Sequence, residues 1–118
     1  MEIYKTEKWR KLRSKALRRD SYKSVLSARY GRSVQADTVH HILPVEIFPE
    51  YMWRLWNLAS MTSGEHDRMH VRRSHQLTAE GMELARRTAL KQGLDVQEVM
   101  RRLESEEDNG GEKKSEGA

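Results

Sequence analysis

The stretch VHHILP, residues 39–44, places two adjacent histidines ahead of a proline in the most apolar region of the chain. Adjacent side chains on a regular strand point to opposite faces, so His40 and His41 can serve one site only where the strand ends. Pro44 cannot donate a ladder hydrogen bond and predicts such an end. One imidazole could then bind a metal ion while its neighbour acts as a base near pH 7. The alternative is one buried and one solvated histidine with no shared task.

A second pair of histidines, His66 and His70, lies four residues apart in an expected helix. The preceding residues 62–65 have the T-x-x-E form of a capping box, which opens a helix by satisfying its first backbone donors. On one helix this spacing sets both imidazoles on the same face, near enough to chelate one divalent ion. The spacing alone also arises by coincidence on polar helices, so it gains weight from the histidine doublet.

The rest of the sequence predicts a mixed α+β chain. Thr6 can cap a basic helix that runs to about Arg19, with Trp9 in its apolar stripe. Runs of β-branched residues indicate strands, and Gly and Asp mark helix ends. We expect strands at 34–42 and 58–61, a loop with a short helical turn at 45–58, helices at 79–92 and 96–103, and irregular structure at 20–34.

The bulk composition bounds the class of protein. With 118 residues, 34% of them charged, the chain has the size of one domain with a small core. It contains no cysteine, which excludes disulfides and thiolate metal ligands. No apolar run approaches the roughly 20 residues that cross a bilayer, and no signal-peptide stretch is present. We therefore expect a soluble, cytoplasmic protein without membrane contact.

Charge is distributed unevenly along the chain. Residues 1–34 carry eleven Lys or Arg and three acids (+8), residues 35–103 carry nine of each (0), and residues 104–118 carry two and six (−4). The basic arm predicts attraction to a polyanion such as nucleic acid, although a solvated helix face would have the same composition. The acidic segment 104–118 cannot bury apolar surface and is expected to be a disordered tail.

An ordered series of motifs resembles the HNH nuclease family, specifically the small phage-type HNH endonucleases. The series consists of D-x-V-H-H-I-x-P at 37–44, Asn57-Leu58 and H-x-x-x-H at 66–70. The flanking sequence agrees, with W-R-K-L-R from Trp9, R-D-x-Y from Arg19 and Gly31-Arg32 ahead of the doublet. The resemblance covers roughly residues 4–70, and a series of this kind is more specific than any single motif.

The resemblance implies a ββα-metal (His-Me finger) core at about residues 34–74 of a single nuclease domain, residues 1–103, with a basic N-terminal helix and additional C-terminal helices. The implied activity is metal-dependent hydrolysis of double-stranded DNA by an endonuclease or nickase, leaving 5′-phosphate and 3′-hydroxyl ends. Relatives of this size often work with a phage terminase, which implies a bacteriophage protein inside a bacterial host. A catalytically silent DNA-binding or phage-packaging accessory module is the alternative.

The resemblance also implies roles for particular residues. His40, His66 and His70 would be the ligands of one divalent ion (Mg, Mn, Zn, Ni or Co), and His41 would be the general base. Asn57 would brace the loop between the strands or hydrogen-bond near the metal, which keeps the base oriented. Sequence-independent contacts to the DNA backbone would come from basic residues, namely Arg10, Lys11, Arg13, Arg68, Arg72 and Arg73.

The sequence departs from the family at a structural zinc site. Many relatives carry two C-x-x-C pairs, whose places here hold Ser24 and Ser27, then Thr62 and Glu65. Hydroxyls and one carboxylate make a poor zinc site, so we expect no structural zinc. Our hypothesis is that helix capping and the tryptophan-containing cluster at 53–56 replace the zinc as the feature that fixes the position of the active-site helix.

Overall fold

The structure is a computed structural model that describes residues 2–105. The chain divides into two compact units, Met1–Asp67 and Arg68–Ala118. Residues 106–118, which make up most of the predicted disordered tail, lie outside the described residues. Across residues 2–105, no helix combines the length and the apolar character that a membrane crossing needs.

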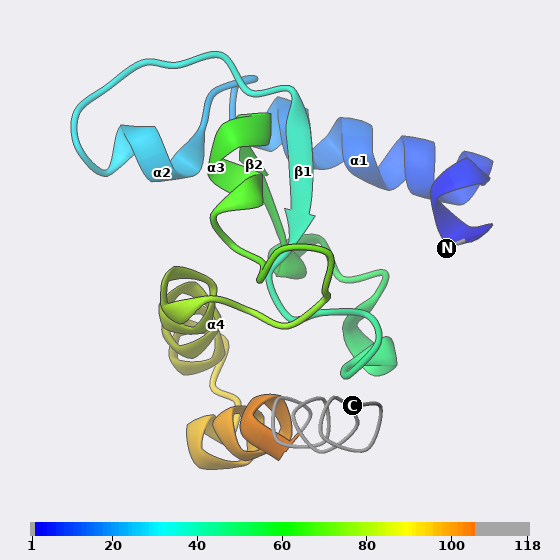
Figure 1. Cartoon of the computed structure of the whole chain (residues 1–118). Coiled ribbons are helices and arrows are strands. Elements are labelled where there is room, and N and C mark those ends of the chain that lie inside the picture. The colour runs from blue at the N-terminus through cyan, green and yellow to red at the C-terminus, as the bar shows by residue number, and fades with distance from the viewer. Residues whose placement is uncertain (1, 106–118) are drawn as a thin grey trace. The chain divides into compact units, whose positions relative to one another are not determined.

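An antiparallel hairpin forms the sheet of the first unit (Figure 1). β1 (Thr38–His41) pairs with β2 (Leu58–Met61), and His41 lies opposite Leu58. The prediction of the second strand is confirmed, whereas the first is shorter than the predicted 34–42. Its beginning is lost because residues 35–36 form backbone contacts with residues 22–23 instead of β2. Its end at His41 places the histidine doublet at a strand terminus, as Pro44 predicts.

The loop between the strands contains two short 3-10 helices, η2 (Pro49–Tyr51) and η3 (Leu55–Asn57), in agreement with the predicted loop and helical turn. Phe48 is fully buried and anchors the loop. The two tryptophans also pack here. Trp53 packs against the core cluster that contains Trp9, and the Trp56 ring lies 5.1 Å from that of Tyr51.

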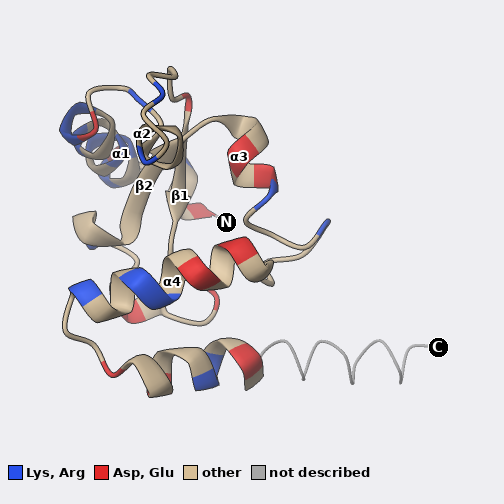
Figure 2. Cartoon of the chain, turned by 90° about the vertical axis from the view of Figure 1, so that its left-hand side faces the viewer, with Lys and Arg blue, Asp and Glu red and all other residues tan. Residues whose placement is uncertain are grey.

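α1 (Glu7–Arg19) packs against the hairpin as the predicted basic helix. Thr6 caps it by accepting a hydrogen bond from Trp9 N at 3.1 Å. Trp9 and Ala16 are buried in one cluster with Leu58 of β2. Lys and Arg occupy much of the remaining surface of the helix (Figure 2). A short 3-10 helix, η1 (Glu2–Lys5), precedes α1.

Residues 20–34, predicted to be irregular, contain a one-turn helix, α2 (Val25–Ala28). Ser24 caps its N-terminus by accepting a hydrogen bond from Ser27 N at 3.1 Å. Beyond the helix, Gly31 adopts a φ of +74°, a left-handed conformation that costs glycine little. The prediction is wrong here because four residues are too few to show a helical period.

α3 (Ser63–Asp67) begins at the predicted capping box. Thr62 Oγ1 accepts a hydrogen bond from Glu65 N at 3.0 Å, and Glu65 Oε1 accepts one from Thr62 N at 2.8 Å. The prediction that His66 and His70 share this helix is wrong. α3 has only five residues and ends before His70.

His70 instead belongs to a short hairpin-like segment at the start of the second unit. It forms an antiparallel bridge with Leu77. On either side, Thr78 N donates to Met69 O at 2.9 Å and Val71 N donates to Gln76 O at 2.8 Å. These pairings use the backbone groups that a continued helix would need, so α3 cannot extend to His70.

Two further helices follow in the described part of the second unit, as predicted. α4 (Ala79–Lys91) is capped by Thr78 and is followed by Gly93 with a φ of +73°. Residues 96–105 are also helical, and Asp95 Oδ1 caps them by accepting a hydrogen bond from Glu98 N at 3.1 Å.

Candidate functional site

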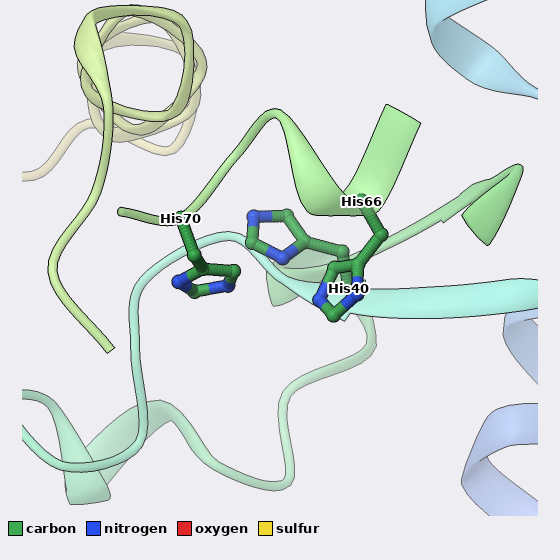
Figure 3. Close-up of side chains that lie close together, drawn as sticks. All are labelled: His40, His66 and His70. Atoms are coloured by element: carbon green, nitrogen blue, oxygen red, sulfur yellow. The ribbon is translucent and has the colours of Figure 1, made fainter. Parts of the chain in front are cut away.

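Three histidines form the candidate site (Figure 3). His40 projects from β1, His66 from α3, and His70 follows the end of α3 by three residues. Each offers one ring nitrogen, and these nitrogens lie within 4.8 Å of one another. His40 is only 1% exposed, and its ring meets that of His66 edge-on with centroids 5.2 Å apart. The three residues expected to be ligands are thus brought together without sharing a helix.

The donor set fits a divalent cation. Neutral imidazole nitrogens are frequent ligands of Zn, Ni and Co. Ligand atoms about 2.0–2.2 Å from one ion stand about 3–4 Å apart, so nitrogens within 4.8 Å need only small side-chain rotations to share it. Within residues 2–105, this is the one group of three or more His, Cys, Asp or Glu side chains with such geometry.

His41, the expected base, contacts a different set of residues from His40. Its ring stacks on Trp9 of α1, with centroids 5.1 Å apart and planes inclined at 26°. This follows from the strand, because successive side chains point to opposite faces. Burial lowers the pKa of His41 and outweighs the raising effects of the Met52 carbonyl and the Glu46 carboxylate. The ring is therefore neutral at neutral pH.

Both ring nitrogens of His41 have partners. Nε2 lies 2.9 Å from Met52 O, and because a carbonyl can only accept, Nε2 carries the proton. Nδ1 is then the basic nitrogen of the neutral ring, and it accepts a hydrogen bond from the Tyr4 hydroxyl at 3.3 Å. Sequence reasoning missed Tyr4 because the contact joins residues 37 positions apart, which no local pattern reports.

Asn57 is fully buried and braces the loop between the strands. Its Oδ1 accepts from Leu43 N at 2.7 Å, and its Nδ2 donates to Leu43 O at 3.1 Å and Tyr51 O at 3.2 Å. Tyr51 directly precedes Met52, whose carbonyl fixes His41. Of the two expected roles of Asn57, the contacts match loop bracing. They also link Asn57 to the expected base, because Asn57 binds Tyr51 and the next residue, Met52, binds His41.

Three of the basic residues expected at DNA lie on α1. Arg10 pairs with Glu7 at 3.2 Å, and Arg13 Nη2 donates to Asp37 O at 2.9 Å. Lys11 is exposed. Exposed ion pairs such as that of Arg10 contribute little to stability, so they compete weakly with a phosphate. Arg13, by contrast, holds the backbone at Asp37, and this hydrogen bond would be lost if the side chain were removed.

The other three basic residues lie at the start of the second unit. Arg68 pairs with Glu80 across 3.5 Å, and both side chains are more than half exposed. Arg72 and Arg73 are exposed, in the turn that follows His70. All three precede α4 and lie within four residues of His70 in the sequence.

The four residues at the expected zinc positions meet around one carboxylate. Ser24 Oγ donates to Glu65 Oε1 at 2.6 Å, and Ser27 Oγ donates to Glu65 Oε2 at 2.7 Å. The Thr62 backbone N–H adds the third hydrogen bond. Burial by itself raises the pKa of Glu65, but these hydrogen bonds outweigh it and lower the pKa, so the group is a carboxylate at neutral pH. The sequence predicts the Thr62 cap but not the two serine contacts.

Comparison with solved structures identifies a similar fold. The crystal structure of the HNH endonuclease of the deep-sea thermophilic bacteriophage GVE2, with a manganese ion, superposes with a TM-score of 0.54. The match covers 56% of this chain and 72% of that chain, at 24% sequence identity. No family model matches the sequence, and no curated protein matches it. The chain is therefore an α+β protein with a fold similar to that of an HNH endonuclease, and its histidine cluster is consistent with a ββα-metal core.

Proposed function

We propose that the protein is a metal-dependent DNA endonuclease or nickase of the HNH type, in which residues 1–103 act as a single nuclease domain on double-stranded DNA. The observation that carries this proposal is the convergence of three imidazoles, one of which, His40, adjoins in sequence a buried histidine with one defined tautomer, His41. The fold likeness supports the same class of reaction, because the similar protein is an HNH endonuclease.

In this proposal His40, His66 and His70 hold one divalent ion, for which Mg, Mn, Zn, Ni and Co are candidates. When bound, the ion supplies positive charge that offsets the negative charge developing on the phosphate and its leaving oxygen. His40 is buried in β1, whereas His66 and His70 are partly exposed, which leaves room for water and a phosphate. A structural zinc is not part of the proposal, because the sequence has no cysteine to bind it.

His41 acts as the general base. Its Nδ1 takes a proton from water, the water oxygen bonds to phosphorus, and the electron pair of the broken P–O bond leaves on the 3′-oxygen, which takes a proton from solvent water. Met52 O orients the ring throughout by holding the Nε2 proton. The attacking water must displace the Tyr4 hydroxyl, whose 3.3 Å contact is longer than a strong O–H···N hydrogen bond and is easily exchanged.

The DNA substrate is held by phosphate contacts. The basic arm of residues 1–34 supports this assignment through its net charge of +8. Arg10, Lys11 and Arg13 of α1 would contact the backbone, with a second set in Arg68, Arg72 and Arg73. These contacts carry no base-edge recognition, so we expect weak sequence specificity.

The test is nicking of supercoiled plasmid by the full chain, with Mg, Mn, Co, Ni or Zn supplied in turn. We expect metal-dependent nicking that is lost in His41→Ala and in His66→Ala. His75→Ala is the matched control, because it removes an imidazole that is not a proposed ligand and keeps the backbone carbonyl that lies 3.3 Å from His70 Nδ1, so it should retain the wild-type rate. Plasmid binding without cleavage under every metal would contradict the enzyme and favour the catalytically silent accessory module.

A further inference from the structure

The carboxylate of Glu65 ties together segments that lie far apart in sequence. It is 8% exposed and contacts Ser24 and Ser27, which lie 41 and 38 residues before it. Ser24 also accepts a hydrogen bond from Ser27 N, so the carboxylate, Ser24 and the first turn of α2 form one connected network. Hydrogen bonds to a carboxylate are stronger than those between neutral groups, so the network is firm.

α3 cannot maintain its own position. It has five residues, and helices this short are not stable without tertiary contacts. The contacts that hold its first turn are the capping box with Thr62 and the two serines of the α2 segment. The residue that follows Glu65 is His66, whose ring lies against that of His40. Where Glu65 is held therefore determines where His66 is presented.

We propose that Glu65 is a positioning residue for the metal centre: by binding Ser24 and Ser27 it fixes α3 so that His66 faces His40. This inference rests on the proposed metal site. A buried carboxylate and two serine hydroxyls, in addition to the helix cap, then hold α3 in position. Without the carboxylate, Ser24 and Ser27 lose a shared acceptor, α3 is no longer tied to the α2 segment, and the imidazole of His66 moves away from His40.

The test measures Mn²⁺ affinity directly, by calorimetry on the full chain, so that its result does not depend on activity. Glu65→Gln keeps the side-chain shape but replaces one acceptor oxygen with an amide that cannot accept from a serine. We expect the Mn²⁺ dissociation constant to rise about tenfold, the usual effect of losing a residue that orients a ligand. In plasmid nicking we expect kcat to fall while KM for DNA stays unchanged.

A matched control separates positioning from stability alone. Glu83→Gln removes an exposed carboxylate that pairs with Arg86, and it should leave Mn²⁺ affinity unchanged. Circular dichroism checks that each variant is folded under the assay conditions. If Glu65→Gln melts at a lower temperature yet binds Mn²⁺ as tightly as the wild type, Glu65 is a structural residue only and the proposal is overturned.

A second variant keeps the test decisive if Glu65→Gln does not fold. Ser27→Ala removes one of the three hydrogen bonds to the carboxylate and leaves Ser24 and Thr62 in place. We expect a smaller loss of Mn²⁺ affinity than in Glu65→Gln, and an unchanged affinity would overturn the positioning role. Wild-type protein that binds Mn²⁺ but does not nick DNA would contradict the proposed function alone. Wild-type protein that binds none of Mg, Mn, Zn, Ni and Co would overturn both.

Discussion

The Nε2 atom of His41 and the carbonyl oxygen of Met52 lie 2.9 Å apart, which joins the end of β1 to the loop between the strands. This contact sets the tautomer of His41, because only a protonated Nε2 can donate to a carbonyl. It thereby leaves Nδ1 as the proton acceptor. In enzymes that use histidine as a base, a fixed acceptor of this kind commonly orients the imidazole.

Removing the imidazole of His41 should slow cleavage strongly without weakening metal binding. His40 and His41 have separate contacts, so His41→Ala should lower the nicking rate about 10²–10⁴-fold, the usual contribution of a general base. The Mn²⁺ dissociation constant, measured by calorimetry, should stay at the wild-type value. Tyr4→Phe is the control, because it keeps the ring against Trp9 and removes one weak hydrogen bond. It should change the rate by less than about tenfold. A metal-binding defect in His41→Ala would contradict this separation.

Asn57 should be needed for both stability and catalysis. Asn57→Ala removes the partner of the Leu43 N–H and of the Leu43 and Tyr51 carbonyls. Each buried group left unsatisfied costs about 1–3 kcal/mol, so we expect a loss of about 3 kcal/mol in the free energy of unfolding, measured in urea. Because Tyr51 precedes Met52, kcat should also fall. Asn57→Asp keeps the acceptor for the Leu43 N–H but places an oxygen against the Leu43 and Tyr51 carbonyls, so it should destabilise the protein at least as much as Asn57→Ala. A clearly smaller loss in Asn57→Asp would contradict the amide's role as donor.

How far the sequence predicts this fold depends on whether each signal is local. The capping box of Thr62 and Glu65 predicts the start of α3, because both partners lie within one turn. The end of α3 depends on pairing between residues 69–71 and 76–78, which no helical period reveals. The sequence therefore predicts His66 and His70 on one helix face, whereas in the structure His66 lies in α3 and His70 in the bridge with Leu77, and both converge with His40.

Contacts between distant segments were not predictable in the same way. The two serine contacts of Glu65 and the Tyr4 contact of His41 each span more than thirty residues. A periodicity or capping argument reports only neighbours within a few positions. The resemblance placed the histidines in an order, but the hydrogen bonds that hold them required the folded chain.

Stability should depend on pH through Asp20. Its carboxylate binds Arg19 through both oxygens and accepts from Ser60 N at 3.2 Å. Burial by itself raises the pKa of Asp20, but these contacts outweigh it and lower the pKa. A depressed folded-state pKa gives stabilisation that is complete above the unfolded value of about 4 and is lost as the pH falls through the folded value.

We therefore expect the free energy of unfolding to decrease below about pH 4 more steeply in the wild type than in Asp20→Asn. Urea denaturation at a series of pH values measures both curves. Asparagine keeps the size of the side chain and removes its titration, so the comparison isolates the carboxylate. Parallel curves for the two proteins would contradict the assignment.

Four cysteines should convert the Glu65 network into a zinc site. Ser24, Ser27 and Thr62 each donate a hydrogen bond to the Glu65 carboxylate, which brings the four positions together, and four thiolates are a preferred tetrahedral zinc set. In a His66→Ala background, which removes one ligand of the candidate metal centre, the quadruple Cys variant should bind zinc. Its Tm should then rise by about 10 °C or more, because structural zinc contributes several kcal/mol.

The matched control for this conversion changes only the two serines to cysteine in the same background. Two thiolates make an incomplete site, so zinc should raise its Tm much less. Zinc content by metal analysis and thermal melts with and without the ion measure both variants. Equal effects of zinc on the two proteins would mean that the four positions do not converge on one ion.

Lys11 and Arg13 share α1 but should respond differently to removal. Lys11 is exposed, whereas Arg13 donates to Asp37 O just before β1. Lys11→Ala should weaken binding of double-stranded DNA and reduce the slope of log affinity against log salt by about one, with no change in Tm. Arg13→Ala should lower both DNA affinity and Tm, because it also breaks a contact between α1 and the chain that enters β1.

Fluorescence anisotropy with labelled duplex at several salt concentrations, together with thermal melts, separates the two effects. Lys91→Ala is a suitable control, because it removes an exposed lysine at the end of α4, outside both proposed sets of phosphate contacts. If Lys91→Ala and Lys11→Ala weaken binding equally, DNA affinity depends only on the net charge of the protein and not on the position of the lysine. A loss confined to Lys11 and Arg13 would mean that α1 itself lies along the phosphate backbone, since the contribution of a cation falls off within a Debye length of about 10 Å.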